Sequence, residues 1–316
     1  MAEGGTVAIL GAGMAGAATA RRLTDAGLDV RVFDKGRGIG GRMATRRTDA
    51  GLRFDHGAQF FRAQGEAFRG QCASWIAAGV ASPWDANGRN VGLPGMPAPV
   101  RHLLDGLPVS LETTIVRIAR TESGWMLTDA AGAVTGPFAA VAVTFPAPQV
   151  TALIDTSGAA LAGPERATYA PCWSLLLDLD AAPGFTESHL TVPDGPIALI
   201  AREETKPGRA PGHRLVVHAA PDWSRTHLED AREAVQAALV AALEARLGRA
   251  LRPKYAAVHR WRYAMVETAL GQPCLYDPVQ RLGAAGDWCL GPRIEAAFDS
   301  GRGLADRIAA DLRGGR

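Results

Sequence analysis

Residues 7–16 read VAILGAGMAG and carry the strongest structural signal in the chain. An apolar run ends in the spacing G-x-G-x-x-G, an alanine-rich helical pattern follows, and a second apolar run ends at Asp34. This order predicts a strand, a helix and a second strand. Gly11 permits a tight turn, Gly13 lets a pyrophosphate approach the backbone, and Gly16 lets the helix lie close to the sheet.

Asp34 indicates which nucleotide this unit binds. It lies 34 − 11 = 23 positions after Gly11, close to the ~20 expected for a carboxylate that binds a ribose hydroxyl. A carboxylate at this position repels a 2′-phosphate, so the sequence favours FAD or NAD over NADP. The alternative is a glycine-rich turn without a nucleotide. The strand, the helix and the following acid argue against it because each occurs where the nucleotide unit requires it.

Composition limits the classes of function. The 316 residues are 47% hydrophobic, with 34 basic and 32 acidic side chains, so neither nucleic acid nor an anionic membrane is predicted as a partner. No apolar run reaches the ~20 residues of a membrane helix. The four cysteines are far apart and form no C-x-x-C pair, which favours a reducing cytoplasm and predicts neither a disulfide framework nor a metal site. They are Cys72, Cys172, Cys274 and Cys289.

A second glycine-rich stretch follows Asp34 and Lys35, and it includes Gly40, Gly41 and Arg42. Backbone N–H groups at such glycines can line a diphosphate, and an arginine adds charge-assisted hydrogen bonds. A solvated basic loop is the alternative for an isolated stretch of this composition. Its position directly after the predicted second strand favours the nucleotide interpretation.

These motifs together resemble the FAD-binding half of the amine oxidase and phytoene desaturase superfamily. The resemblance implies that the glycine pair and Arg42 contact the FAD diphosphate. It assigns the remaining contacts of this part of the cofactor to Gly11, Ala12, Gly13, Met14, Ala15, Gly16, Asp34 and Lys35.

Residues 55–61 read DHGAQFF, and within the superfamily this turn is similar to that of the renalase-like oxidoreductases. The resemblance implies that the turn passes the flavin ring and then reaches the substrate. It assigns His56, Gly57, Ala58 and Gln59 to the flavin, and Gln59, Phe60 and Phe61 to the substrate, with His56 and Gln59 as candidate catalytic residues. The alternative is that the two phenylalanines belong to the core and His56 only to the turn.

The next segment alternates loop and strand signals. The Pro/Gly-rich span 92–99 predicts a loop that could line a pocket mouth, where Met96 could contact a ligand, although simple loop packing is the alternative. Apolar runs between residues 109 and 128 predict a small antiparallel meander. The resemblance implies a backbone contact from Val116 to adenine.

Residues 147–280 carry a different pattern. Strand-like runs at 173–179, 197–201, 215–218 and 256–264 accompany one predicted helix over 226–247, which Thr226-x-x-Glu229 would begin as a capping box. An antiparallel sheet with a packed helix accounts for this pattern. Trp261 and Tyr263 are candidates for the substrate cavity, although a half-buried strand with arginines facing solvent explains the same residues.

The last motif is Gly-Asp at residues 286–287, followed by a helix with small residues on one side. By resemblance, Asp287 binds the diphosphate and ribityl region of FAD. The helix that begins at Ile294 then points its N-terminus at the flavin pyrimidine, where the helix dipole stabilises negative charge.

The predicted fold class is therefore α/β, with a Rossmann-like FAD-binding domain assembled from separated segments and an α+β substrate domain containing an antiparallel sheet. The resemblance implies an architecture like that of amine oxidase and p-hydroxybenzoate hydroxylase. We assign residues 1–61, 106–146 and 281–316 to the FAD-binding domain, and 62–105 and 147–280 to the substrate domain.

The resemblance also implies a function. A renalase-like enzyme would oxidise 2- and 6-dihydroNAD(P) to NAD(P)+, pass hydride to N5 of a non-covalent FAD, and produce hydrogen peroxide from O2. An amine oxidase or desaturase of the same superfamily is the alternative enzyme, and a flavin-binding module without turnover is the alternative from another class. The sequence makes no prediction of the oligomeric state.

Overall fold

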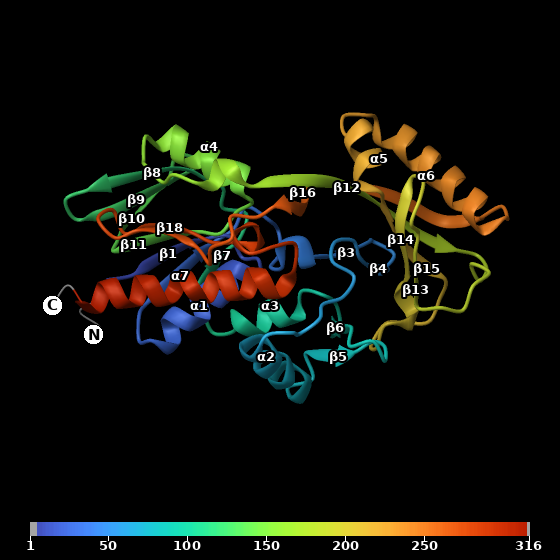
Figure 1. Ribbon diagram of the computed structural model, residues 1–316, viewed down its shortest axis with the longest axis horizontal. Coiled ribbons are helices and arrows are strands. Elements are labelled where there is room, and N and C mark those ends of the chain that lie inside the picture. The colour runs from blue at the N-terminus through green and yellow to red at the C-terminus, as the bar shows by residue number, and fades with distance from the viewer. Residues whose placement is uncertain (1–4, 315–316) are drawn as a thin grey trace.

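The structure is a computed structural model that describes residues 5–314. Residues 1–4 and 315–316, which our domain assignment gives to the FAD-binding domain, lie outside the described residues. The molecule is elongated and has two units. A mixed α/β unit fills one end and an antiparallel sheet the other, as Figure 1 shows.

The first unit is built on a six-stranded sheet with the order β17-β18-β11-β1-β2-β7. Five strands are parallel and β17 pairs antiparallel at one edge. The strands are β1 (Val7–Leu10), β2 (Val30–Phe33), β7 (Val109–Ser110), β11 (Ala140–Val143), β17 (Leu275–Asp277) and β18 (Leu282–Ala284). Segments far apart in the sequence therefore share one sheet, and the predicted α/β fold is confirmed.

Both faces of this sheet are covered, which explains why β1 is an unbroken apolar run. Val7 and Ile9 share a core with residues of α1 (Met14–Asp25) and α7 (Ile294–Gly314). Ala8 and Leu10 face the other way and share a core with the antiparallel meander and with α4. That second layer consists of β8 (Ile115–Thr121), β9 (Gly124–Asp129), β10 (Val134–Phe138) and α4 (Ala147–Ser157).

The second unit is a five-stranded antiparallel sheet with the order β13-β14-β15-β12-β16. Val235, Leu239 and Leu243 of its main helix pack into the same apolar core as Leu175 and Leu177 of β12. The predicted antiparallel sheet is confirmed. Its elements are β12 (Thr168–Leu179), β13 (His189–Thr191), β14 (Ile197–Arg202), β15 (Arg214–Ala219), α5 (Pro221–Thr226), α6 (Arg232–Leu247) and β16 (Pro253–Thr268).

The predicted helix over 226–247 is wrong in its first turns. Helix α5 ends at Thr226, residues 227–231 are not helical, and α6 begins only after Ala231. Glu229 caps no helix, because its carboxylate instead accepts hydrogen bonds from Arg260 at 2.9 Å and Arg262 at 2.6 Å. The two arginines of β16 thus bind the carboxylate that the sequence predicts as part of a capping box.

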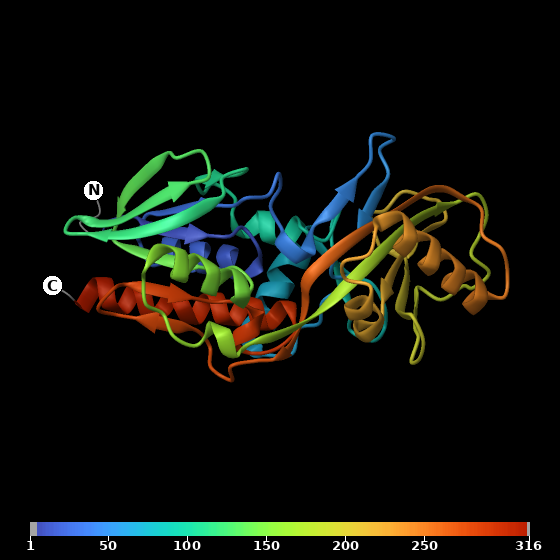
Figure 2. The same ribbon diagram turned by 90° about the horizontal axis from the view of Figure 1, so that it is seen from above.

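Two long strands, β12 and β16, run from the first unit into the second, which Figure 2 shows from above. The hairpin of β3 (Thr45–Arg47) and β4 (Arg53–Asp55) lies beside them. None of the described helices has the length and apolar character needed to cross a membrane.

The segment 62–105, which we assigned to the substrate domain, packs its apolar side chains into the core of the first unit. Phe68, Trp75 and Val100 are fully buried in the cluster that contains Val7. The elements of this segment are α2 (Glu66–Ala77), β5 (Ala81–Pro83), β6 (Asn90–Gly92) and α3 (Ala98–Leu103).

Candidate functional site

The glycine turn after β1 has the geometry of a phosphate-binding turn. A Cβ added to Gly16 would lie 1.9 Å from the carbonyl oxygen of Gly11, and Gly11 itself has φ +115°. No side chain caps the N-terminus of α1 at Gly13, and no acid stands in its first turn. The helix end is therefore free to receive an anion.

The second glycine stretch lies directly against this turn. A Cβ added to Gly41 would lie 3.3 Å from the Cα of Gly13, and Gly40 donates its N–H to the carbonyl of Ala12 at 2.9 Å. The structure thus brings residues 11–16 and 40–42 together, as the sequence predicts for two loops around one diphosphate.

Asp34 ties the loops together from the end of β2. Its carboxylate accepts the N–H of Ala12 and the N–H of Gly36, both at 2.6 Å. A carboxylate has about four acceptor positions, so these two bonds leave capacity for a ribose hydroxyl. The ribose contact itself stays a prediction.

A surface cavity of about 340 Å³ lies beside the end of β2. Lys35 and Val116, predicted cofactor contacts from distant parts of the sequence, both line it, together with Phe33, Phe145 and Gln149. Ligand sites in proteins commonly fall between about 300 and 1,000 Å³. Apolar side chains line most of the cavity, and Lys35, Gln149 and three threonines are its polar groups. The contact of Val116 with adenine stays a prediction.

Arg42 and Asp287 form a bidentate ion pair across 245 residues of sequence, with N–O distances of 2.8 and 2.7 Å. Asp287 also accepts the N–H of Trp288 at 3.0 Å. Burial works against the charge of Arg42, but Asp287 outweighs it, and the pKa of Arg42 is raised. The second and the last motif therefore meet at one place.

The turn of residues 55–61 lies against Arg42. Ala58 donates its N–H to the carbonyl of Arg42 at 2.9 Å. A Cβ added to Gly57 would lie 1.9 Å from that carbonyl oxygen and 3.4 Å from the ring of Trp261. Only glycine fits between them, so the turn needs Gly57 for a close approach rather than for a positive φ.

Two histidines and Trp261 pack together behind the turn. The rings of His56 and Trp261 are stacked with centroids 5.1 Å apart, and His259 meets the His56 ring edge-on at 4.6 Å. Burial lowers the pKa of both histidines to about 4, with Arg46 adding repulsion at each. Both imidazoles are therefore neutral at pH 7, and Nδ1 of His56 has no hydrogen-bond partner in the described part of the chain.

The alternation of β16 separates its two kinds of side chain. His259 and Trp261 share one face, because side chains two apart in a strand point the same way, and their ring centroids are 4.4 Å apart. Tyr263 lies in the stretch between Trp261 and Met265, where the pairing with β12 changes register. Tyr263 packs edge-on against Tyr169 at 5.7 Å, and the Tyr169 ring lies 5.9 Å from the guanidinium of Arg42. Arg260 and Arg262 bind Glu229 on the other side. A contact of Trp261 or Tyr263 with a substrate stays a prediction.

Gln59 points into the protein. It is 3% exposed, its amide donates to the carbonyl oxygens of Gly57 and Asp55, and its oxygen accepts a hydrogen bond from Lys206 at 3.0 Å. His218 lies 3.4 Å from the amide nitrogen, and burial lowers the pKa of this histidine to about 4.

Lys206 belongs to a buried charge cluster that the sequence analysis missed. We define it as Asp55, Glu203, Lys206 and Arg209, whose side chains are at most 2% exposed. Lys206 contacts both carboxylates, and Arg209 binds Asp55 at 2.5 Å. Burial would raise the pKa of Asp55, but the two cations lower it; burial raises the pKa of Glu203. In the sequence, the only hint of this cluster is that Glu203, Lys206 and Arg209 follow one another at intervals of three residues.

The remaining predicted substrate residues lie at different depths. Phe61 and Met96 are 3% and 0% exposed and belong to the apolar core of the first unit. Phe60 is half-buried between Trp84 and the guanidinium of Arg89, 4.9 Å from its ring. Their contacts with a substrate stay predictions.

Ile294 begins α7, as predicted, and is half-buried beside the core of the first unit. Its neighbour Glu295 is buried and accepts N–H groups of Gln64 and Gly65 at the start of α2. This helix end therefore holds the start of α2 in place next to the turn that follows β4.

Two family models match the chain. A model of an NAD(P)-binding Rossmann-like domain matches residues 9–72, and a model described as flavin containing amine oxidoreductase matches residues 74–309. The second match spans more than half of the chain. The residues of the glycine turn, the cavity and the Arg42–Asp287 pair fit the FAD that such proteins contain.

Solved structures with the same fold cover almost the whole chain. Cyclohexylamine oxidase from Brevibacterium oxydans IH-35A matches with a TM-score of 0.74 at 14% identity, covering 98% of this chain and 99% of its own. A protein of Exiguobacterium sp. 255-15, provisionally described as a protoporphyrinogen oxidase, matches with 0.75 at 15% identity over 98% and 99%. A CLA-producing fatty acid isomerase from P. acnes matches with 0.69 at 13% over 97% and 99%.

Proposed function

The chain belongs to the family of flavin containing amine oxidoreductases, and we propose that within it the protein is an oxidase of isomeric dihydronicotinamide dinucleotides. Its substrates would be 2- and 6-dihydroNAD(P), its product NAD(P)+, and its electron acceptor O2. The proposal deepens the family assignment by naming the substrate class.

The neutral imidazoles around the turn at residues 55–61 carry the proposal. His56, His218 and His259 all have pKa values lowered to about 4, so the imidazoles near the turn are uncharged at pH 7. Loss of hydride from a dihydronicotinamide gives the aromatic pyridinium directly, so this reaction needs no base to remove a proton. A site with neutral imidazoles and aromatic rings suits that chemistry.

When bound, FAD would supply the acceptor for the hydride and the route by which two electrons, with a proton from solvent, reduce O2 to hydrogen peroxide. The chain has to hold a flat substrate and keep it oriented. His259 and Trp261, whose ring centroids are 4.4 Å apart, form an aromatic surface on β16 next to the turn that suits a flat substrate.

A second candidate function is the oxidation of a primary or secondary amine. The family description and the likeness to cyclohexylamine oxidase favour it. An amine must lose its proton before it yields a hydride, so its oxidation depends on pH near neutrality. The dinucleotide reaction has no such requirement.

Anaerobic stopped-flow mixing separates the candidates. The purified yellow protein is mixed with 6-dihydroNAD, ordinary NADH or a panel of amines, and the absorbance of the flavin at about 450 nm is followed. We expect fast bleaching by the 6-dihydro isomer, recovery and peroxide on admission of air, and a rate that is flat between about pH 6 and 8 because the imidazoles stay neutral.

Bleaching by an amine, with a rate that rises with pH, would replace the proposal with the second candidate. If no compound bleaches the flavin, the protein is a flavin-binding module without this turnover. Protein precipitated with acid should release its FAD into the supernatant, because we propose that the cofactor is not covalently bound.

The remaining assignments are also proposals. We infer a cytoplasmic protein, because a reducing compartment suits the four free cysteines, Cys72, Cys172, Cys274 and Cys289.

We also retain the division into an FAD-binding and a substrate domain. The packing of residues 66–103 supports moving this segment to the FAD-binding domain.

A further inference from the structure

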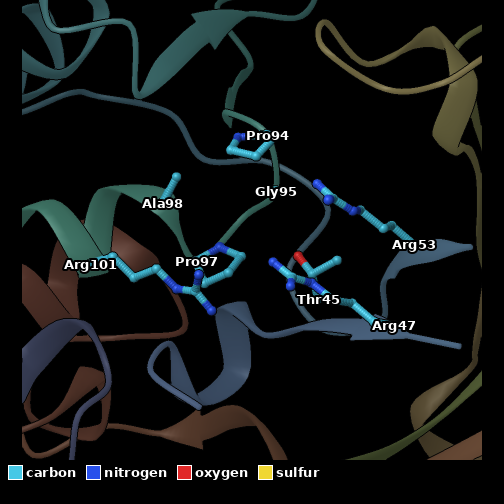
Figure 3. A pocket seen from close by; sticks show the side chains of 8 residues that line it. All are labelled: Thr45, Arg47, Arg53, Pro94, Gly95, Pro97, Ala98 and Arg101. Carbon is cyan, nitrogen blue, oxygen red and sulfur yellow. The ribbon is translucent and has the colours of Figure 1, made fainter. Parts of the chain in front are cut away.

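A small pocket opens on the face of the β3–β4 hairpin that is turned toward α3, as Figure 3 shows. Its volume is about 60 Å³. Since one water needs roughly 10–15 Å³ by this kind of measure, a group the size of phosphate fits. The lining residues are Thr45, Arg47, Arg53, Pro94, Gly95, Pro97, Ala98 and Arg101.

The pocket carries three positive charges and no negative one. Arg47 and Arg53 come from the hairpin and Arg101 comes from α3 on the opposite side (Figure 3). None of the lining residues is acidic. Within residues 5–314, none of the three guanidinium groups forms an ion pair with a carboxylate.

Arg47 and Arg53 are moreover direct cross-strand neighbours in the ladder of β3 and β4. Like charges at directly opposite positions destabilise an antiparallel pair. A bound anion between them would turn this repulsion into charge-assisted hydrogen bonds, which are about twice as strong as neutral ones. The arrangement therefore gains most when an anion is present.

The pocket is close to the proposed reaction site. Thr45 donates a hydrogen bond of 2.5 Å to Asp55, the residue before His56, and Asp55 also accepts the N–H of Met96 beside the pocket. Arg53 precedes Gly57 by four residues, which at about 3.3 Å per residue of extended chain is a distance of at most roughly 13 Å. A dinucleotide in an extended conformation is long enough to reach from one to the other.

We propose that Arg47, Arg53 and Arg101 form a binding site for a phosphate group. The pocket contains none of the residues 11–16 or 40–42, and it lies beside the loop of Gly40, where a Cβ added to that glycine would be 2.8 Å from the Cβ of Pro97. The phosphate could belong to the dinucleotide substrate, an identification that rests on the proposed function, or it could be free phosphate. Both sources share the same recognition chemistry.

Titration calorimetry of the FAD-loaded protein with inorganic pyrophosphate tests the site without any turnover. We expect Arg47→Gln and Arg53→Gln to weaken pyrophosphate binding at least about tenfold each, the factor for roughly 1.4 kcal/mol. Arg252→Gln is the matched control, because Arg252 is also exposed and forms no ion pair in the described part of the chain. Flavin absorbance per protein should be the same in all four proteins.

Two results overturn the site: pyrophosphate does not bind the unmodified protein, or the hairpin variants bind it as well as Arg252→Gln does. A loss of flavin in Arg47→Gln or Arg53→Gln would also contradict it, by assigning the arginines to the cofactor.

Anaerobic reduction by 6-dihydroNAD and 6-dihydroNADP then identifies the source of the phosphate. If the substrate supplies it, the variants need about tenfold more dinucleotide for half-maximal reduction, while the limiting rate is unchanged. If they lose pyrophosphate binding but keep the dinucleotide dependence of the unmodified protein, the ligand is free phosphate. A protein that no dinucleotide reduces refutes the proposed function, whereas the calorimetry still decides the site.

Discussion

The glycine turn of residues 11–16 and the turn of residues 55–61 both pass close to the expected position of FAD, but they are held in different ways. Contacts close in the sequence hold the first turn, where a Cβ at Gly16 would lie 1.9 Å from the carbonyl oxygen of Gly11 and the Asp34 carboxylate accepts the N–H of Ala12 at 2.6 Å. Side chains from the other unit fix the second, because Lys206 and Arg209 bind Asp55 and Trp261 donates to the carbonyl of His56 at 2.8 Å. The first turn is thus a local structure, and the second depends on the contact between the units.

The largest effect is expected from Gly16→Ala. The added methyl group would lie 1.9 Å from a backbone oxygen, so its cost should exceed the ~1–3 kcal/mol of ordinary overpacking. We expect purified Gly16→Ala protein to contain no flavin, measured by absorbance. Gly38→Ala is the control, because a Cβ there meets nothing within 4 Å. Equal flavin content in both variants would show that the close contact at Gly16 does not fix the turn.

Lys206→Met tests the second turn. It leaves Asp55 and Glu203 buried without their shared cation, and breaking a buried pair in this way costs about 3–5 kcal/mol. Lys254, whose side chain is 60% exposed and lies 3.4 Å from Asp178, provides the control, because an ion pair with a solvated cation contributes only about 0–1 kcal/mol. Urea unfolding should therefore separate Lys206→Met from Lys254→Met by several kcal/mol, and similar midpoints would show that the cluster does not hold the units together.

Arg42→Gln tests the ion pair with Asp287 that lies beside the second turn. The variant loses a bidentate pair to Asp287, and hydrogen bonds to charged groups contribute roughly 1.5–3 kcal/mol. We expect FAD affinity to fall by about ten- to a hundredfold, measured by titrating the apoprotein with FAD and following fluorescence. Arg22→Gln removes an exposed pair with Asp306 and should leave the affinity unchanged; a loss of the same size there would refute a specific role for Arg42.

The smallest expected effect is the loss of stability at acidic pH that the buried His56 causes. Its pKa is about 4 in the folded protein, against 6.5 in the unfolded chain, so between these values the unfolded state binds more protons. The free energy of unfolding is therefore highest above about pH 6.5, where His56 is neutral in both states, and it decreases as the pH falls toward 4. At pH 5.5 the loss is about 1 kcal/mol.

Thermal unfolding at pH 7.5 and pH 5.5 measures this loss. The melting temperature of the unmodified protein should fall more between the two pH values than that of His56→Gln. The exposed His102 provides the control variant His102→Gln, which should behave like the unmodified protein. An identical pH dependence in all three proteins would show that His56 is not held neutral by burial.

The sequence by itself determined the elements whose signals are local. The strand, the glycine turn, α1 and Asp34 could be predicted because the steric demands of glycine and the period of apolar residues act within a few residues. The strand predicted over 256–264 was readable for the same reason and lies within β16.

Only the tertiary structure decided which charged side chains are buried and which partners they find. Nothing near Arg42 in the sequence points to Asp287, and nothing near Asp55 points to Lys206 or Arg209. Glu229 formed ion pairs with β16 instead of a capping box. A charged side chain is normally solvated, and its burial depends on partners that folding brings from far along the chain; such partners leave no local pattern to read.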